Sequence, residues 1–212
     1  MQSQIVIDDM RSWENAMFLY GSAIKEVTTK LEILNDEFRE IHKYNPIEYI
    51  ESRLKTAESI VKKLHRYGYD TTMENMQQYV NDIAGVRVVC SFTSDIYRVA
   101  EMIEKLPDFN VFRVKDYMKN PKPSGYRSYH MLATVPVSTT TGTVPVKAEI
   151  QIRTIAMDFW ASLEHKIYYK YEGHAPEHIS RELQECAYIT SQLDEKMMIL
   201  HEEILQVKKS EE

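Results

Sequence analysis

The chain has 212 residues, of which 43% are hydrophobic and 27% are charged, and its net charge is −6. These values are typical of a globular protein with one domain and helical appendages. The acidic balance argues against a surface that coats nucleic acid, so RNA binding is not indicated by charge and any anion site must be local.

The N-terminal residues and the two cysteines indicate in which cellular compartment the protein is expected. The first apolar run ends at Asp8, so we expect neither a signal peptide nor a membrane span, and a cytoplasmic location by default. Cys90 and Cys186 match no metal-ligand or redox spacing. Both are therefore expected to be free, buried thiols.

Helices are expected first along the chain. Apolar residues recur every three or four positions over about 12–44, which predicts one long amphipathic helix. Residues 45–48 (Asn-Pro-Ile-Glu) combine a capping side chain, a proline at the first helical position and a carboxylate three residues after the cap. They predict a second helix that ends near Gly68, and a shorter helix should follow over 72–80.

Strands are expected in the central part. The residues after Gly85 are mostly β-branched and apolar, which is typical of a buried strand over 86–92. Ser94 or Asp95 should cap the next helix, which should stop near Pro107. Three more strands are predicted, and a polar turn makes the last two an antiparallel hairpin. Their ranges are 109–114, 128–137 and 144–152.

The pattern becomes helical again after Thr154, with a break near Gly173 and Pro176. A last helix is expected over about 176–207, where apolar residues keep three-to-four spacing between charged ones. Its apolar face could pack on its own domain or form an oligomer contact, and the pattern leaves both open.

The loop over 115–130 combines backbone breakers with reactive side chains. Pro121, Pro123 and Gly125 forbid a continuous helix there. Cations interleaved with aromatic rings suit a phosphorylated base, but a solvated basic loop between two strands explains the same composition. The residues concerned are Lys115, Lys119, Lys122, Arg127, Tyr117, Tyr126, Tyr129 and His130.

Two carboxylates stand close to predicted strands. Asp82 precedes the first strand, and Glu149 lies in the last one, where polar and apolar residues alternate. This alternation places Lys147, Glu149, Gln151 and Arg153 on one face. A solvent-facing edge strand explains the pattern. If the face instead lines a cleft, Asp82 and Glu149 could bind Mg²⁺ and help to deprotonate a hydroxyl.

A basic row is expected on the predicted second helix, where Lys55, Ser59 and Lys63 follow one another at i, i+4 spacing. Such a row is usually solvated surface, but it could also hold an anion. The sequence contains no glycine-rich phosphate-binding loop, so side chains would have to hold any phosphates.

Five blocks of the sequence stand out together: Arg53-x-Lys55, Asp82-Ile-Ala-Gly-Val-Arg87, Lys115-Asp-Tyr, Pro121-Lys-Pro-Ser-Gly-Tyr-Arg-Ser-Tyr-His130 and Glu149-Ile-Gln-Ile-Arg-Thr154. In order and spacing they resemble the (p)ppGpp synthetase domain of RelA/SpoT proteins, over about 45–172. An N-terminal helix over 1–44 and a C-terminal helix over 173–212 would flank it, as in small alarmone synthetases of the RelP type. The resemblance implies an α/β (α+β), nucleotidyltransferase-like fold with a mixed sheet of about five strands flanked by helices.

The resemblance also implies an activity and a site. The activity is Mg²⁺-dependent transfer of the β,γ-pyrophosphate of ATP to the ribose 3′-hydroxyl of GDP or GTP, which makes the stringent-response alarmone (p)ppGpp. Asp82 and Glu149 would bind Mg²⁺, and one of them would activate the hydroxyl. The ATP-binding residues would be Arg53 and Arg87, around the adenine, and Lys55, Ser59 and Lys63, on the phosphates. Tyr126 would stack on the guanine, and the other acceptor residues would be Lys115, Lys122, His130, Gln151, Asp158, Glu164 and His165.

Assembly and alternative functions complete the expectations. The resemblance implies a homotetramer assembled through the terminal helices, which favours the oligomer contact for the last helix. The residues alone are also compatible with a non-catalytic module that binds nucleotide or single-stranded RNA through the basic loop. A third hypothesis is a helical assembly protein whose loop is incidental. Dispensable carboxylates would indicate the binding module, and loss of all function on truncation before Glu182 would indicate the assembly protein.

Overall fold

A five-stranded mixed β-sheet forms the centre of the chain in the computed structural model, which describes residues 2–170 and 176–211. The strand order is β1-β2-β5-β4-β3, in which β2 and β5 run parallel and the other neighbours are antiparallel. The predicted mixed sheet is therefore confirmed. Its strands are β1 (Ile47–Leu54), β2 (Ala84–Cys90), β3 (Asn110–Asp116), β4 (Tyr129–Thr139) and β5 (Gly142–Thr154).

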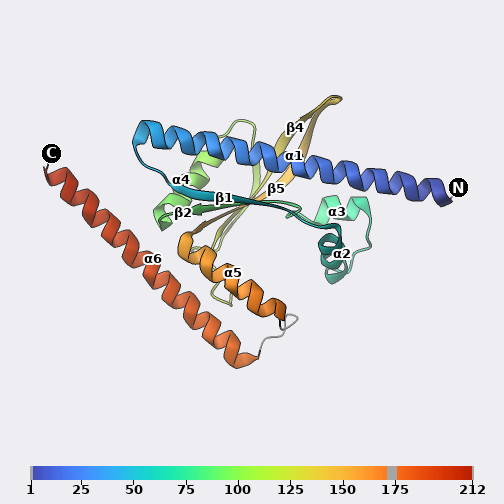
Figure 1. Cartoon of the computed structure of the whole chain (residues 1–212). Coiled ribbons are helices and arrows are strands. Elements are labelled where there is room, and N and C mark those ends of the chain that lie inside the picture. Colours follow the sequence, from blue (N-terminus) through green and yellow to red (C-terminus); the bar gives the residue numbers. More distant parts are fainter. Residues whose placement is uncertain (1, 171–175, 212) are drawn as a thin grey trace.

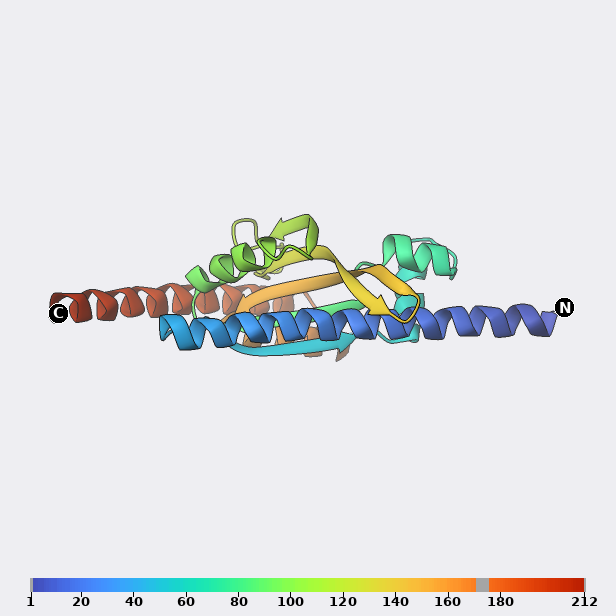
Figure 2. The same ribbon diagram turned by 90° about the horizontal axis from the view of Figure 1, so that it is seen from above.

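Helices lie on both sides of this sheet. α1 and α4 cover one face, and α5 and α6 lie on the opposite side (Figure 1). Seen from above, α1 lies in front of the sheet and α6 behind it, so the chain forms three layers (Figure 2). The described helices are α1 (Gln2–His42), α2 (Ala57–Arg66), α3 (Met73–Tyr79), α4 (Thr93–Glu104), α5 (Ile155–Lys170) and α6 (Glu177–Glu211).

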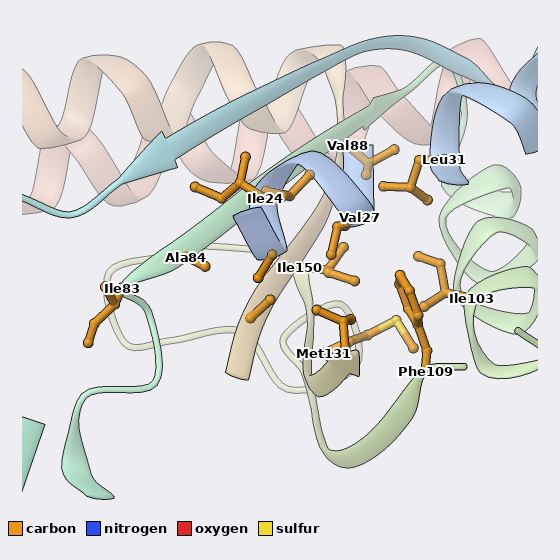
Figure 3. Packing of buried hydrophobic residues seen from close by; sticks show 14 of the residues in the cluster. Ile24, Val27, Leu31, Ile83, Ala84, Val88, Ile103, Phe109, Met131 and Ile150 are labelled. Atoms are coloured by element: carbon orange, nitrogen blue, oxygen red, sulfur yellow. The ribbon is translucent and has the colours of Figure 1, made fainter. Parts of the chain in front are cut away.

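The hydrophobic core lies between the sheet and the layer of α1 and α4. Val27 and Leu31 of α1 are fully buried, and Val27 lies beside Ile150 of β5 (Figure 3). Each Å² of apolar surface that α1 buries stabilises its packing on the sheet by ~25 cal/mol, so this helix belongs to the core. Because side chains alternate along β5, Glu149 and Gln151 point to the opposite face of the sheet.

The prediction is wrong for the first half of the second helix, because residues 47–54 form the edge strand β1. This segment pairs with β2 in antiparallel register, with Arg53 opposite Gly85. The ladder with β2 satisfies the backbone groups of the segment, and this tertiary pairing overrides the local helix signals at 45–48.

The second half of that helix is present as α2, with a different cap. Thr56 is the N-cap, and its hydroxyl accepts the backbone N–H of Ser59 at 3.3 Å. Lys55 therefore precedes the helix and does not share a helical row with Ser59 and Lys63. The consequence for the site is that Lys55 and Lys63 approach it from two different segments.

The cap of α4 also differs from the prediction. The helix begins at Thr93, before Ser94 and Asp95. Asp95 lies in the first turn, where its carboxylate accepts the backbone N–H of Phe92 at 3.3 Å. It still satisfies a free donor at the helix start, but from inside the helix.

The other predicted elements within the described residues are confirmed, with shifted ends. α1 begins earlier than predicted, at Gln2, and the turn of the β4-β5 hairpin pairs Thr139 with Gly142. The predicted break near Gly173 lies outside the described residues. The division into 1–44, 45–172 and 173–212 stays a prediction.

Two further observations concern the cysteines and the membrane. Both cysteines are free, as predicted, and Cys90 is buried. The expectation of a buried thiol is wrong for Cys186, because it lies on an exposed side of α6. No helix in the described ranges is long and apolar enough to cross a membrane.

Candidate active site

One residue from each strand lines up across the face of the sheet opposite the core. Strand register pairs these residues in the order Glu51, Arg87, Gln151, His130 and Lys115. Paired residues on neighbouring strands point to the same side of a sheet. β5 is the central strand, so a solvent-facing edge does not explain its polar alternation.

Two cavities open on this face. The edge cavity, beside β1, has a volume of about 210 Å³, and the loop cavity, beside the β3–β4 loop, has a volume of about 320 Å³. Asp82, Glu149 and Gln151 line both cavities. The edge cavity adds Glu51, Ser52, Arg53, Lys55, Gly85, Val86 and Arg87, and the loop cavity adds Lys63, Lys115, Tyr117, Lys122, Ser124, Tyr126, His130 and Glu164.

Asp82 lies between two lysines. Lys55 Nζ is 2.9 Å from its Oδ2, and Lys63 Nζ is 2.8 Å from its Oδ1. The backbone N–H of Lys55 donates to the carbonyl of Ile83 at 2.9 Å, which fixes the approach of this lysine. Burial acts to raise the pKa of Asp82, but hydrogen bonds from Lys63 and Lys55 outweigh it and hold the pKa below its ordinary value. The ionised carboxylate is thus neutralised by two ammonium groups.

Five side chains, one of which is Glu149, form a closed hydrogen-bonded ring. Arg153 Nη2 donates to Tyr126 Oη at 2.7 Å and to Gln151 Oε1 at 2.8 Å. Gln151 Nε2 donates to Glu149 Oε2 at 2.8 Å. His130 closes the ring, with Nδ1 3.2 Å from Glu149 Oε1 and Nε2 2.7 Å from Tyr126 Oη. These contacts fix the orientation of Glu149 between the two cavities.

The ring also assigns the protons. An ionised Glu149 only accepts, so His130 donates from Nδ1 and accepts the hydroxyl of Tyr126 at Nε2. Burial lowers the pKa of His130, although Glu149 opposes this, and so favours the neutral imidazole in this arrangement. Burial acts to raise the pKa of Glu149, but hydrogen bonds from His130 and Gln151 keep it below its ordinary value. Every bond in the ring is satisfied in this state.

Arg153 links the ring to the edge cavity. It is buried on β5, and its Nη1 lies 3.0 Å from Oδ1 of Asp158. Arg87 Nη1 lies 3.2 Å from the same oxygen and 3.0 Å from Oε2 of Glu51. Asp158 therefore joins Arg153 of the ring to Arg87, which lines the edge cavity.

Tyr126 is 9% exposed and packs in a small cluster with Trp160, Leu183 and Ala187. Lys122 Nζ lies 4.5 Å from the centroid of its ring, a cation–π geometry, and burial lowers the pKa of Lys122. A base that stacks on Tyr126 would have to displace this ammonium group. Lys122 would then be free to contact phosphate.

The structure brings most of the predicted site residues to the two cavities and separates three from them. Ser59 accepts a hydrogen bond from the Thr56 hydroxyl at 2.9 Å and lines neither cavity. Asp158 is buried against Arg153 and His165 is exposed on α5, and neither residue lines a cavity. Their predicted contacts with nucleotide stay predictions.

Some site residues were not assigned from the sequence. Arg153 could have been, because the alternation on β5 places it on the face of Glu149 and Gln151. Tyr117 lies in the predicted binding loop. Glu51 carried no such signal, because its segment reads locally as helix.

The two shared carboxylates fit Mg²⁺ that arrives with a substrate. Asp82 and Glu149 both line the edge cavity and the loop cavity, and the charge of Asp82 acts against the net lowering of the pKa of Glu149. Within 2–170 and 176–211, no three His, Cys, Asp or Glu side chains group so that they could hold a metal ion. Mg²⁺ is commonly bound by one or two carboxylates together with waters and substrate phosphates.

Comparisons with known proteins agree with this geometry. Residues 52–174 match the region found in RelA / SpoT proteins. GTP pyrophosphokinase YwaC of Bacillus subtilis (strain 168) is 49% identical over 195 residues, which cover 92% of this chain and 93% of YwaC. The crystal structure of small alarmone synthetase 1 from B. subtilis bound to its product pppGpp is similar with a TM-score of 0.85 and 38% identity, over 91% of this chain and 97% of that one. The structure of that synthetase bound to AMPCPP gives a TM-score of 0.79 and 36% identity, over 92% and 99%.

Proposed function

Since this chain belongs to the RelA/SpoT family, we propose that it transfers the β,γ-pyrophosphate of ATP to the ribose 3′-hydroxyl of GDP or GTP and so makes (p)ppGpp. This is the GTP pyrophosphokinase activity for which its relative YwaC is named. The pppGpp and AMPCPP bound to small alarmone synthetase 1 support a guanosine acceptor and an adenosine donor.

The observation that carries the proposal is the junction of the two cavities. A transfer between two nucleotides needs two subsites that meet where charge develops. Asp82, Glu149 and Gln151 line both cavities, so the two carboxylates stand at that meeting point. A module that only binds nucleotide or RNA has no need of carboxylates there, because they repel phosphate.

The edge cavity is the proposed donor site. Arg53 and Arg87 line it from β1 and β2 and would hold the adenine between them. Lys55 and Lys63 would turn from Asp82 to the ATP phosphates, since both ammonium groups already lie at the junction. Ser59 stays a predicted phosphate contact. The exchange releases the oxygens of Asp82.

The loop cavity is the proposed acceptor site. Tyr126 would stack on guanine, at ~1–3 kcal/mol for one ring, with Lys115, Lys122 and Glu164 around the nucleotide. His130 and Gln151 hold the two oxygens of Glu149, which orients this carboxylate toward the 3′-hydroxyl. Asp158 and His165 would act on this side indirectly.

The chemistry is an in-line displacement. The 3′-oxygen forms a bond to the β-phosphorus, the bond from that phosphorus to the α,β-bridging oxygen breaks, and AMP leaves. Glu149 or Asp82 accepts the hydroxyl proton. Mg²⁺ held by these carboxylates and the phosphates would neutralise charge on the transferred group. The lysines at the junction supply the remaining positive charge.

A homotetramer is the proposed assembly. α6 carries a row of exposed apolar side chains that a second copy of the chain could cover. They include Leu193, Met197, Leu200, Ile204 and Val207. The cytoplasm is the proposed location, because ATP and guanine nucleotides are supplied there.

The test uses two labels and an acceptor control. With Mg²⁺ and GDP, ATP labelled at the γ-phosphate should give a labelled guanosine product, whereas ATP labelled at the α-phosphate should give labelled AMP. 3′-Deoxy-GDP should give no product, because it lacks the attacking oxygen. Absence of a labelled guanosine product with both Mg²⁺ and Mn²⁺ would overturn the proposal.

A further inference from the structure

We propose that α6 sets the position of the acceptor loop, with Ala187 and Gln184 as positioning residues for the acceptor nucleotide. The inference rests on the proposed function, because it takes the loop cavity to be the acceptor subsite. It assigns to α6 a role in substrate affinity that is separate from any role in assembly.

The segment 122–126 of the loop is a tight, closed turn. The N–H of Gly125 donates to the carbonyl of Lys122 at 2.8 Å, and the N–H of Lys122 donates to the carbonyl of Tyr126 at 3.1 Å. Gly125 has a φ of +87°, a backbone conformation that residues other than glycine rarely adopt. Because the turn is closed on itself, it moves as a unit, and it carries Lys122, Ser124 and Tyr126 into the loop cavity.

Gly125 of the turn packs against α6 so closely that no room is left for a Cβ atom. A Cβ atom at Gly125 would lie 2.5 Å from Cβ of Ala187, and 3.9 Å from the Cα atoms of Ala187 and Gln184. The glycine therefore lies directly on the alanine. A larger side chain at either position would push the turn away from the helix.

Two further contacts fix the orientation of the turn relative to α6. Gln184 Nε2 donates to the carbonyl of Pro123 at 2.9 Å. Tyr126 packs with Leu183 and Ala187, and Trp160 of α5 donates from Nε1 to the Leu183 carbonyl at 3.0 Å. Three α6 residues at i, i+1 and i+4 thus hold the backbone and the aromatic ring of the turn.

α6 is in turn fixed to the sheet. The hydroxyl of Thr154, the last residue of β5, donates to Oδ2 of Asp194 at 2.7 Å, and both side chains are buried. β5 also carries Glu149. The helix therefore connects the acceptor turn to the strand that holds the carboxylate. The proposed donor residues Arg53, Lys55 and Arg87 lie on other segments.

The experiment compares the two substrates in one set of variants. Ala187→Leu should raise the KM for GDP by on the order of tenfold or more, as expected for a displaced binding element, and should leave the KM for ATP within about twofold. Ala187→Gly should raise the KM for GDP much less than Ala187→Leu does, because it leaves room for the turn and removes only one methyl group from the packing against Tyr126. Cys186→Leu adds a leucine at the exposed neighbouring position and serves as the matched control.

A compensating pair tests the contact itself. Gly125→Ala should raise the KM for GDP, and Gly125→Ala combined with Ala187→Gly should recover part of the loss, because the second change removes the Cβ that the first one meets. Gln184→Ala should have a smaller effect in the same direction. Light scattering and circular dichroism on every variant separate these effects from changes in assembly or folding.

The outcomes are distinct. An unchanged KM for GDP in Ala187→Leu, or equal increases in the KM for GDP and ATP, would overturn the positioning role while the proposed function stands. If wild-type protein makes no product, the proposed function fails. Equilibrium binding of a fluorescent GDP to the same variants then decides the inference, which fails if Ala187→Leu binds GDP as wild type does.

Discussion

Lys63 Nζ lies 2.8 Å from Oδ1 of Asp82, and this ion pair joins a proposed phosphate ligand to a proposed metal ligand. Lys55 occupies the other oxygen of the carboxylate. In the absence of nucleotide, the two lysines would therefore compete with a metal ion for Asp82. Nucleotide phosphates would reverse this competition, because they attract the lysines and leave the carboxylate to the ion.

Replacing Lys63 by methionine should change metal and nucleotide binding in opposite directions. Mn²⁺ binding without nucleotide, measured by electron paramagnetic resonance, should tighten roughly tenfold, because one cation partner of a partly buried carboxylate is lost. Binding of AMPCPP should weaken by about 1.5–3 kcal/mol, the contribution of a charge-assisted hydrogen bond. Asp82→Asn is the control and should bind Mn²⁺ weakly with or without nucleotide. Parallel weakening of both ligands in Lys63→Met would contradict the competition.

Arg153→Lys should destabilise the protein by about 3 kcal/mol, because lysine cannot make the three contacts to Tyr126, Gln151 and Asp158. Urea unfolding measures the loss. Asp158→Asn should lower the free energy of unfolding less in the Arg153→Lys background than in the wild type, because the carboxylate of Asp158 has already lost its contact with Arg153 there. Strict additivity of the two changes would show that the ion pair does not couple them.

Much of this architecture follows from local patterns. The alternation over 147–153 predicts which β5 side chains share a face, and strand pairing then adds His130 from β4. What periodicity cannot supply is strand order. The edge-strand interpretation of β5 failed because a central strand with a polar cleft on one side has the same alternation as an edge strand.

The role of α6 shows a second limit of sequence reasoning. Its three-to-four spacing predicts a helix with an apolar face, and α6 does bury Leu183 and Ala187. These residues also hold the turn around Gly125. Helical spacing cannot predict this contact, because Ala187 and Gly125 are 62 residues apart in the sequence. Truncation before Glu182 is accordingly expected to expose Tyr126 and weaken acceptor binding, and not only to change the oligomer.

Gly85→Val should block the edge cavity selectively. Gly85 lines this cavity, and a Cβ there would lie 3.5 Å from the carbonyl oxygen of Arg53, an ordinary contact. The backbone thus accepts a side chain, and valine suits a strand, but its methyl groups would occupy the space proposed for the donor. The KM for ATP should rise on the order of tenfold, with the KM for GDP within about twofold.

Gly85→Ala is the matched control for that substitution, since its single methyl group should raise the KM for ATP less. Thermal unfolding checks that both variants fold. If Gly85→Val raised the KM for GDP instead, the assignment of donor and acceptor to the two cavities would have to be exchanged.

Asp194 should give the stability a measurable pH dependence. Burial raises its pKa above the ordinary value, although the hydrogen bond from Thr154 opposes the shift. A carboxyl with a raised folded pKa binds its proton more tightly in the native state. Its contribution to stability is therefore greatest below the unfolded pKa of about 3.9 and is lost as the pH rises through the folded pKa.

Asp194→Asn tests this directly, because asparagine can still accept the hydroxyl of Thr154 but does not titrate. The variant should be as stable as wild type, or more stable, at pH 7, and should lose that advantage toward pH 4, as measured by urea unfolding across this range. Thr154→Val should instead cost about 1–3 kcal/mol at pH 7, because the buried carboxylate then lacks its donor. A strongly destabilised Asp194→Asn at pH 7 would mean that the negative charge itself, and not the hydrogen bond, holds α6 to β5.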